Sequence, residues 1–138
     1  GTIMDGRETE TTARAIVHES RQWSVDPWLV YAVIRLESGF DRNERGTSGE
    51  IGLMQVMPET GRWIAQVVLR EEYRSDALWD VATNIRYGTS FLSLLLRENE
   101  GDVVRALTAY NTGRPRSEPN AYARRVMQIH QRALASAR

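Results

Sequence analysis

Apolar residues recur at helical intervals along most of the chain, and no segment shows the strict alternation typical of a strand. The pattern predicts an all-α fold. The second helix has the clearest start signal, because Asp26 can cap its N-terminus and Pro27 suits the first helical position. Gly39 is expected to follow its last turn in a left-handed conformation. The six expected helices span residues 8–22, 27–38, 58–67, 80–97, 102–109 and 120–135.

The same pattern predicts which helix faces are buried. In the first helix, Ala13, Ile16 and Val17 form the expected apolar side. The fourth helix is expected to bury four large side chains. They are Ile85, Phe91, Leu92 and Leu95.

A long polar, glycine-bearing segment at residues 40–57 separates the second and third helices. It is longer than most connections between helices. Leu53 and Met54 are the expected core residues beneath it. Because long ordered loops beside a rigid scaffold tend to carry function, this loop is the first place to look for a site.

Glu37 lies on an otherwise aliphatic stripe of the second helix. At about 100° per residue, Val30, Val33, Ile34 and Glu37 fall within roughly 100° of one another. An isolated carboxylate there is costly to ionise, so its pKa is expected to rise toward the range that a general acid needs. The alternative is an acid that is solvated or paired with an arginine from a neighbouring helix.

Composition narrows the range of possible functions. The 138 residues suit one domain, the net charge is zero, and there is no cysteine. No basic stripe points to nucleic acid. His18 and His130 lie far apart without metal-ligand spacing, so they are expected to be surface or helix-packing residues. No metal or cofactor is expected.

Four short blocks resemble one known family. Glu37 opens E-S-G-F, residues 49–60 read G-E-I-G-L-M-Q-V-M-P-E-T, residues 106–113 read A-L-T-A-Y-N-T-G, and residues 122–126 read Y-A-R-R-V. In this order they resemble the soluble lytic transglycosylase catalytic domain, which has a goose-lysozyme-like fold with a substrate groove. The resemblance implies a single domain over residues 1–138 with a core at about 12–130. Residues 1–7 are expected to be disordered or foreign to the natural chain.

The resemblance implies a reaction. Enzymes of this family cleave the β-1,4 bond between N-acetylmuramic acid and N-acetylglucosamine in peptidoglycan without water, and they leave a 1,6-anhydromuramoyl end. Glu37 matches the single catalytic acid of the family. Ordinary glycosidases need two carboxylates; here the sugar's own C6 hydroxyl would attack. Glu50 is the residue to check as a second carboxylate.

The resemblance also implies substrate-binding residues. Gln55 offers an amide to sugar hydroxyls and N-acetyl groups, and Tyr110 offers a phenol to the acid or to an N-acetyl carbonyl. Gly52 would allow close backbone approach. The other expected binding residues are Ser48, Met57, Asn111 and Tyr122, and Ser38 is either a helix-end residue or a ligand.

One position departs from the family pattern. Many members have a serine where this chain has Gly46, placed to hydrogen-bond the acid or the N-acetyl group. The nearest hydroxyl here is Ser48, two residues later, with Thr47 beside it. Either the loop is shifted or that contact is missing. We expect Glu37, Gln55, Met57 and Tyr110 to converge on one groove.

Three other readings compete with the lytic transglycosylase. They are a lysozyme-type hydrolase with the same acid and a water, a non-catalytic peptidoglycan-binding domain, and a helical nucleic-acid binder, which the zero net charge disfavours. The expected partners are peptidoglycan glycan strands and other envelope proteins or domains, with the chain itself a monomer. The periplasm or cell envelope is the expected location, with an export signal outside this sequence.

Overall fold

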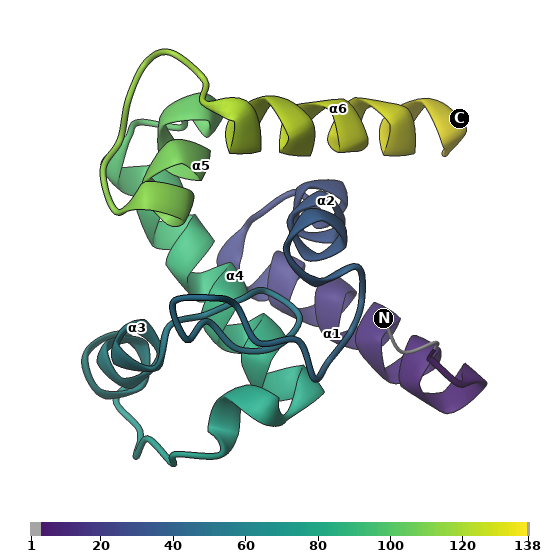
Figure 1. Cartoon of the computed structure of the whole chain (residues 1–138), viewed down its shortest axis with the longest axis vertical. Coiled ribbons are helices and arrows are strands. Elements are labelled where there is room, and N and C mark those ends of the chain that lie inside the picture. The colour runs from purple at the N-terminus through teal and green to yellow at the C-terminus, as the bar shows by residue number, and fades with distance from the viewer. Residues whose placement is uncertain (1–3, 138) are drawn as a thin grey trace.

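The computed structural model describes residues 4–137, and these fold into packed helices (Figure 1). Within that range no strand forms, and the loop contains only the isolated bridges Arg45–Ile51 and Ile51–Val56. The all-α prediction is therefore confirmed. The elements are α1 (Gly6–Trp23), α2 (Pro27–Ser38), α3 (Pro58–Trp63), the π-helical turn η1 (Ile64–Val68), the 3-10 turn η2 (Ala77–Trp79), α4 (Val81–Glu98), α5 (Val103–Thr112) and α6 (Ala121–Ser136).

Side-chain caps explain why the helices start where they do. Asp26 accepts a hydrogen bond from the Trp28 amide at 2.8 Å, and Gly39 follows α2 at a φ of 59°. Equivalent caps begin α4, α5 and α6 at Asp80, Asp102 and Asn120. These local signals are readable in the sequence.

The start of α1 differs from the prediction. Asp5 accepts from the Glu8 amide at 2.8 Å, so the helix begins at Gly6 instead of residue 8. Of the two alternatives expected for residues 1–7, disorder therefore does not hold for 5–7, and residues 1–3 lie outside the described part of the chain. The cap was missed because the first turn has no apolar residue to reveal helical periodicity.

The buried face of α1 is also rotated from the predicted one. Val17 is 44% exposed, whereas Glu19 is buried and accepts a hydrogen bond from the Trp23 indole nitrogen at 3.1 Å. Because Glu19 and Trp23 form a hydrogen bond with each other, this face can pack against α4 without being fully apolar. The buried residues are Thr12, Ile16, Glu19 and Ser20.

The expected third helix, residues 58–67, is two elements. After α3 the chain widens into η1, where the Leu69 amide donates to the Ile64 carbonyl at 2.9 Å. The wider turn buries Ile64 and Ala65, while Val67 is 55% exposed.

Helix α4 is the centre of the molecule. It packs against α1, α5 and both short turns, while α2 packs against α6 (Figure 1). Val30, Val33 and Ile34 of α2 are fully buried. His130 of α6 lies 2.7 Å from the Asp26 carboxylate, so it is a helix-packing residue, as predicted. These contacts fix α2, the helix that carries Glu37.

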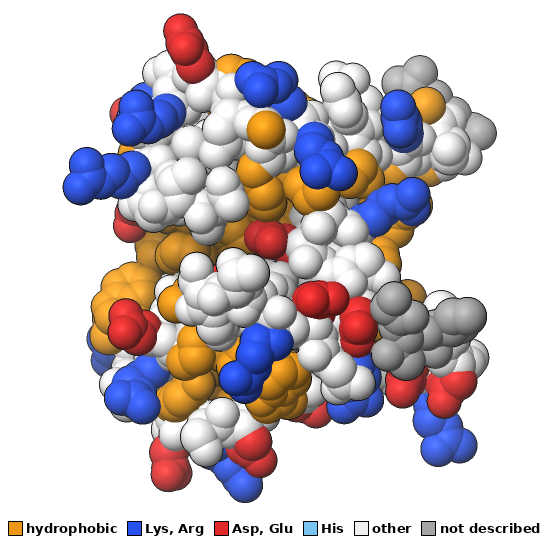
Figure 2. All heavy atoms as spheres, viewed as in Figure 1, with side chains coloured by type: hydrophobic (Ala, Val, Ile, Leu, Met, Phe, Trp, Pro, Cys, Tyr) orange, Lys and Arg blue, Asp and Glu red, His pale blue; other side chains and the backbone are white. Residues whose placement is uncertain are grey.

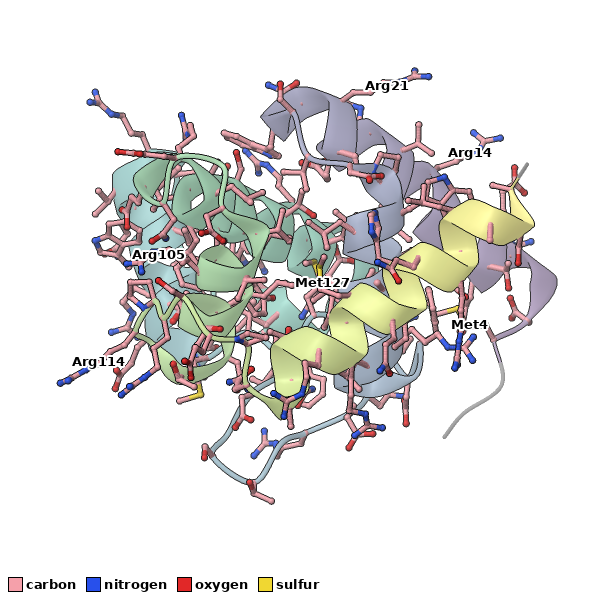
Figure 3. The ribbon with its side chains drawn as sticks, turned by 90° about the horizontal axis from the view of Figure 1, so that it is seen from above. Met4, Arg14, Arg21, Arg105, Arg114 and Met127 are labelled. Atoms are coloured by element: carbon pink, nitrogen blue, oxygen red, sulfur yellow. The ribbon has the colours of Figure 1, made fainter. Side chains whose placement is uncertain are left out.

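Arg14 and Arg21 of α1 point outward on one side of the molecule, and Arg114 points outward away from them (Figure 3). Over residues 4–137, no helix has the length and apolar character that a membrane crossing requires.

Candidate active site

A buried asparagine holds the 40–57 loop on α4. Asn84, only 1% exposed, donates from its amide to the Ile51 and Leu78 carbonyls, both at 2.8 Å. Its carbonyl oxygen accepts from the Met54 amide at 2.8 Å. All the polar atoms of this side chain are thus bonded to backbone, two of the three hydrogen bonds in the loop and one in η2.

The loop also touches the helix that bears the acid. Ser38 is buried and donates to the Leu53 carbonyl at 2.8 Å, so it is a helix-end residue that ties α2 to the loop. Leu53 and Met54 are core residues, as predicted. Gly88 of α4 makes room for Met54, since a Cβ on Gly88 would lie 2.7 Å from the Met54 Cβ.

The loop and four helices, α2, α3, α4 and α5, line a groove. Figure 2 shows it as a hollow across the face between the α5–α6 part and the part formed by the loop and α3, with hydrophobic side chains along it and acidic side chains beside them. Its lining includes the four residues expected to converge there, so that prediction is confirmed. The lining residues are Glu37, Ser48, Glu50, Gln55, Val56, Met57, Thr60, Phe91, Tyr110 and Asn111.

Glu37 is half-buried in this groove, and its pKa is raised from 4.5 to about 7. Burial is the main cause, a hydrogen bond from Tyr122 opposes it, and the negative charge of Glu50 adds to it. The Tyr122 hydroxyl donates to Glu37 Oε2 at 3.0 Å. Across residues 4–137 no arginine forms a salt bridge with Glu37, so the ion-paired alternative does not hold.

The two tyrosines of the family-like blocks make different contacts. Tyr110 lines the groove, but its hydroxyl donates to the Met54 carbonyl at 2.7 Å, so the phenol braces the loop. Its ring packs on Phe91 with centroids 5.5 Å apart. Burial, with Glu37 nearby, raises the pKa of Tyr110 well above 10. Tyr122, predicted as a sugar-binding residue, holds the acid from α6 and is not among the residues that line the groove.

Gln55 and Gly52 are held by hydrogen bonds within the loop. The Gln55 side-chain nitrogen donates to the Glu44 and Gly52 carbonyls at 3.1 and 2.9 Å, so its carbonyl oxygen is the atom left to meet a sugar. Gly52 does not line the groove. It is glycine because its φ is 77° and a Cβ would lie 2.8 Å from the Leu78 carbonyl oxygen.

Sequence reasoning missed two contributors. Phe91 was expected in the core but is half-buried at the groove. Asn84 was not predicted, although an amide on the apolar stripe of a predicted helix signals a buried polar role. No cluster of three or more side chains suited to metal binding occurs in the described residues.

Together, the fold and the groove define a class of protein. It is a helical domain that presents a half-buried acid, with a pKa near neutrality, from the end of a core helix beside a braced loop.

Comparison with known proteins then gives the family. The sequence model of the family described as the transglycosylase SLT domain matches residues 14–131, and the chain therefore belongs to that family. Over 103 residues it is 34% identical to the membrane-bound lytic murein transglycosylase C of Actinobacillus succinogenes. That match covers 68% of this chain and 29% of the relative, so the chain spans about three tenths of the relative's length.

Solved structures share the fold. An inactive mutant of the lytic transglycosylase Slt from Pseudomonas aeruginosa superimposes with a TM-score of 0.78 at 23% identity, over 89% of this chain and 24% of that one. The 70-kDa soluble lytic transglycosylase of Escherichia coli gives a TM-score of 0.67 at 22% identity, over 86% and 18%. A complex of the 70-kDa enzyme with bulgecin A gives 0.69 at 23% identity, over 86% and 18%.

Proposed function

We propose that this chain is the catalytic domain of a peptidoglycan lytic transglycosylase that cleaves the β-1,4 bond between N-acetylmuramic acid and N-acetylglucosamine. One observation carries the proposal. Glu37 lies in the groove with a pKa of about 7, and Tyr122 holds it in place. A carboxyl that still carries its proton near neutral pH can act as a general acid.

The reaction needs only this one carboxyl to move protons. Glu37 protonates the glycosidic oxygen as the bond from that oxygen to the anomeric carbon breaks. The resulting carboxylate then removes the proton from the C6 hydroxyl, and O6 bonds to the anomeric carbon. The products are an N-acetylglucosamine 4-hydroxyl and a 1,6-anhydromuramoyl end, and Glu37 is protonated again.

The hydrogen bonds around Glu37 indicate which of its oxygens does this. Oε2 accepts from the Tyr122 hydroxyl at 3.0 Å, so the transferable proton belongs on Oε1. Ser48, Met57 and Asn111 of the groove lining are the proposed sugar contacts. Gln55 contributes through its carbonyl oxygen.

Digestion of purified peptidoglycan, followed by mass spectrometry, tests the proposal. The transglycosylase product is lighter by one water than the hydrolase product. We expect anhydro ends from the wild type and none from Glu37→Gln, while Glu118→Gln, an exposed loop acid, behaves as wild type. Reducing ends throughout would show a hydrolase, and glycan binding without any product would show a non-catalytic binding domain.

A ligand test is independent of turnover. The 70-kDa soluble lytic transglycosylase is known in complex with bulgecin A. If the groove described here has the same recognition chemistry, bulgecin A will raise the melting temperature of this chain in a concentration-dependent way. Thermal denaturation across a ligand titration measures this, and an unchanged melting temperature at saturating ligand would contradict a shared groove.

We further propose that the chain works as a monomer in the cell envelope on glycan strands, together with other envelope proteins or domains. The name of the A. succinogenes relative, a membrane-bound murein transglycosylase, supports the envelope location. Fractionation of the source cells checks the location, and sedimentation of the purified domain checks the monomer.

A further inference from the structure

Gly46 is the position that departs from the family pattern, and other side chains fill the space where its own side chain would lie. A Cβ on Gly46 would lie 2.6 Å from Glu50 Oε2 and 2.8 Å from Gln55 Oε1. The φ of Gly46 lies outside the left-handed region, so its backbone would accept a side chain. The Glu50 carboxylate, with the Gln55 side-chain oxygen beside it, fills the space that a serine would take.

Glu50 is fixed in that space by the loop itself. Its Oε1 accepts from the Ser48 amide at 2.8 Å, and its carbonyl accepts from the Gly46 amide at 2.8 Å. Its side chain lines the same groove as Glu37. Gly46 and Glu50 therefore form a matched pair, in which the missing side chain of one makes room for the carboxylate of the other.

We propose that Glu50 is a positioning residue for Glu37, and that its carboxylate takes the place of the serine hydroxyl that the resemblance implies beside the acid. This inference rests on the proposed function. A hydroxyl can donate or accept, whereas an ionised carboxylate only accepts and brings a negative charge. The replacement therefore changes the electrostatics of the groove as well as its hydrogen bonding.

The charge of Glu50 acts on the proton of Glu37. The groups that face Glu37 are Tyr122 from α6, Tyr110 from α5 and Glu50 from the loop, and of these Glu50 brings the negative charge that raises the pKa of Glu37. Glu50 thus helps to keep the acid protonated at neutral pH. Without it, Glu37 would lose its proton at lower pH.

The test is the pH profile of transglycosylase turnover for Glu50→Gln. We expect near-normal turnover at pH 5 and a loss of about threefold at pH 7, with KM little changed. The pH at which turnover falls should shift to a lower value. Glu59→Gln is the matched control, because Glu59 is exposed on α3 and outside the groove lining. A Glu50→Gln profile that superimposes on the wild type would overturn the proposal.

A second pair of variants tests the space at Gly46. Gly46→Ser adds a side chain that displaces the Glu50 carboxylate without removing its charge from the chain. We expect it to shift the profile in the same direction as Glu50→Gln. The double variant Gly46→Ser/Glu50→Gln should show no larger shift or loss than Glu50→Gln alone, because the carboxylate that the serine would displace is already absent. Additive losses in the double variant would contradict a matched pair.

The outcomes separate this inference from the proposed function. A wild type that makes no anhydro product ends the proposed function, whatever Glu50 does. Anhydro product with an unchanged Glu50→Gln profile ends this inference alone. Loss of turnover at every pH in Glu50→Gln, with reducing ends in the wild type, would make Glu50 the second carboxylate of a hydrolase and overturn both.

Discussion

Three influences set the proton affinity of Glu37. Burial and the charge of Glu50 raise its pKa, and the Tyr122 hydrogen bond lowers it, with a balance at about 7. Burial alone would favour a neutral acid that gives up its proton reluctantly. The tyrosine stabilises the carboxylate that forms once the proton has left. Glu37 can therefore act as an acid in one step and as a base in the next.

The activity of the wild type should follow the protonated fraction of Glu37. Because the acid must carry its proton to start the reaction, turnover is expected to fall as pH rises through about 7. Initial rates on soluble glycan fragments between pH 5 and 9 measure this. Constant turnover across that range would exclude Glu37 as the acid.

Tyr122→Phe should shift the fall in turnover, the alkaline limb of the pH profile, to higher pH. Removing the hydroxyl takes a donor from the Glu37 carboxylate, so the pKa of Glu37 rises and the limb shifts to higher pH. Tyr31→Phe is the control, because the Tyr31 hydroxyl contacts Arg35 away from the groove. A limb that stays in place or moves to lower pH would show that the hydrogen bond does not tune the acid.

At the scale of elements, the positions of the helices could be predicted from the sequence, whereas the conformation of the 40–57 loop could not. Helix starts depend on neighbouring residues such as Asp26 and Pro27, which the sequence displays side by side. The loop conformation depends on Asn84, which lies 30 residues beyond the Met54 amide it holds. A pattern read along the chain identifies an asparagine in an apolar stripe but not its partners.

Gly88→Ala tests how closely the loop must approach α4. Helix propensity alone favours alanine by about 1 kcal/mol. The new Cβ would lie 2.7 Å from the Met54 Cβ, and overpacking typically costs about 1–3 kcal/mol. Met54 cannot move aside easily, because Asn84 holds its amide and Tyr110 its carbonyl. We expect a net loss of about 1 kcal/mol or more and reduced turnover.

Urea denaturation measures that balance. Ala13→Gly, at an exposed site in the interior of α1, reports the propensity contribution alone. If Gly88→Ala is more stable than the wild type by about that amount, the close packing of the loop on α4 has no energetic weight.

At the scale of the whole molecule, the site joins segments that are distant in sequence. Tyr122 and Glu37 are 85 residues apart, and they meet because α6 packs against α2. The aliphatic stripe was enough to predict a raised pKa for Glu37. It could not show that Tyr110 braces the loop while Tyr122 holds the acid, because both tyrosines lie in family-like blocks and only the packing of α5 and α6 distinguishes them.

A buried acid should also lower the stability of the molecule that uses it. The folded pKa of Glu37 is about 7 and its ordinary value is 4.5, so the folded state holds this proton more tightly than the unfolded state. The stability from this group is complete below about pH 4.5 and is lost as pH rises through about 7. Glu37→Gln, which cannot ionise, should therefore be more stable than the wild type by up to roughly 3 kcal/mol at pH 8, and equally stable near pH 4.

Urea denaturation of both proteins at pH 4, 6 and 8 measures this difference, with Glu118→Gln as an exposed control. The Tyr122 hydroxyl keeps an acceptor in the glutamine variant, so its hydrogen bond does not mask the effect. A difference that does not grow with pH would mean that Glu37 ionises as easily in the folded state as in the unfolded one. The acid would then lack the protonated state at neutral pH on which the proposed mechanism depends, because the same raised pKa underlies both the stability cost and the catalysis.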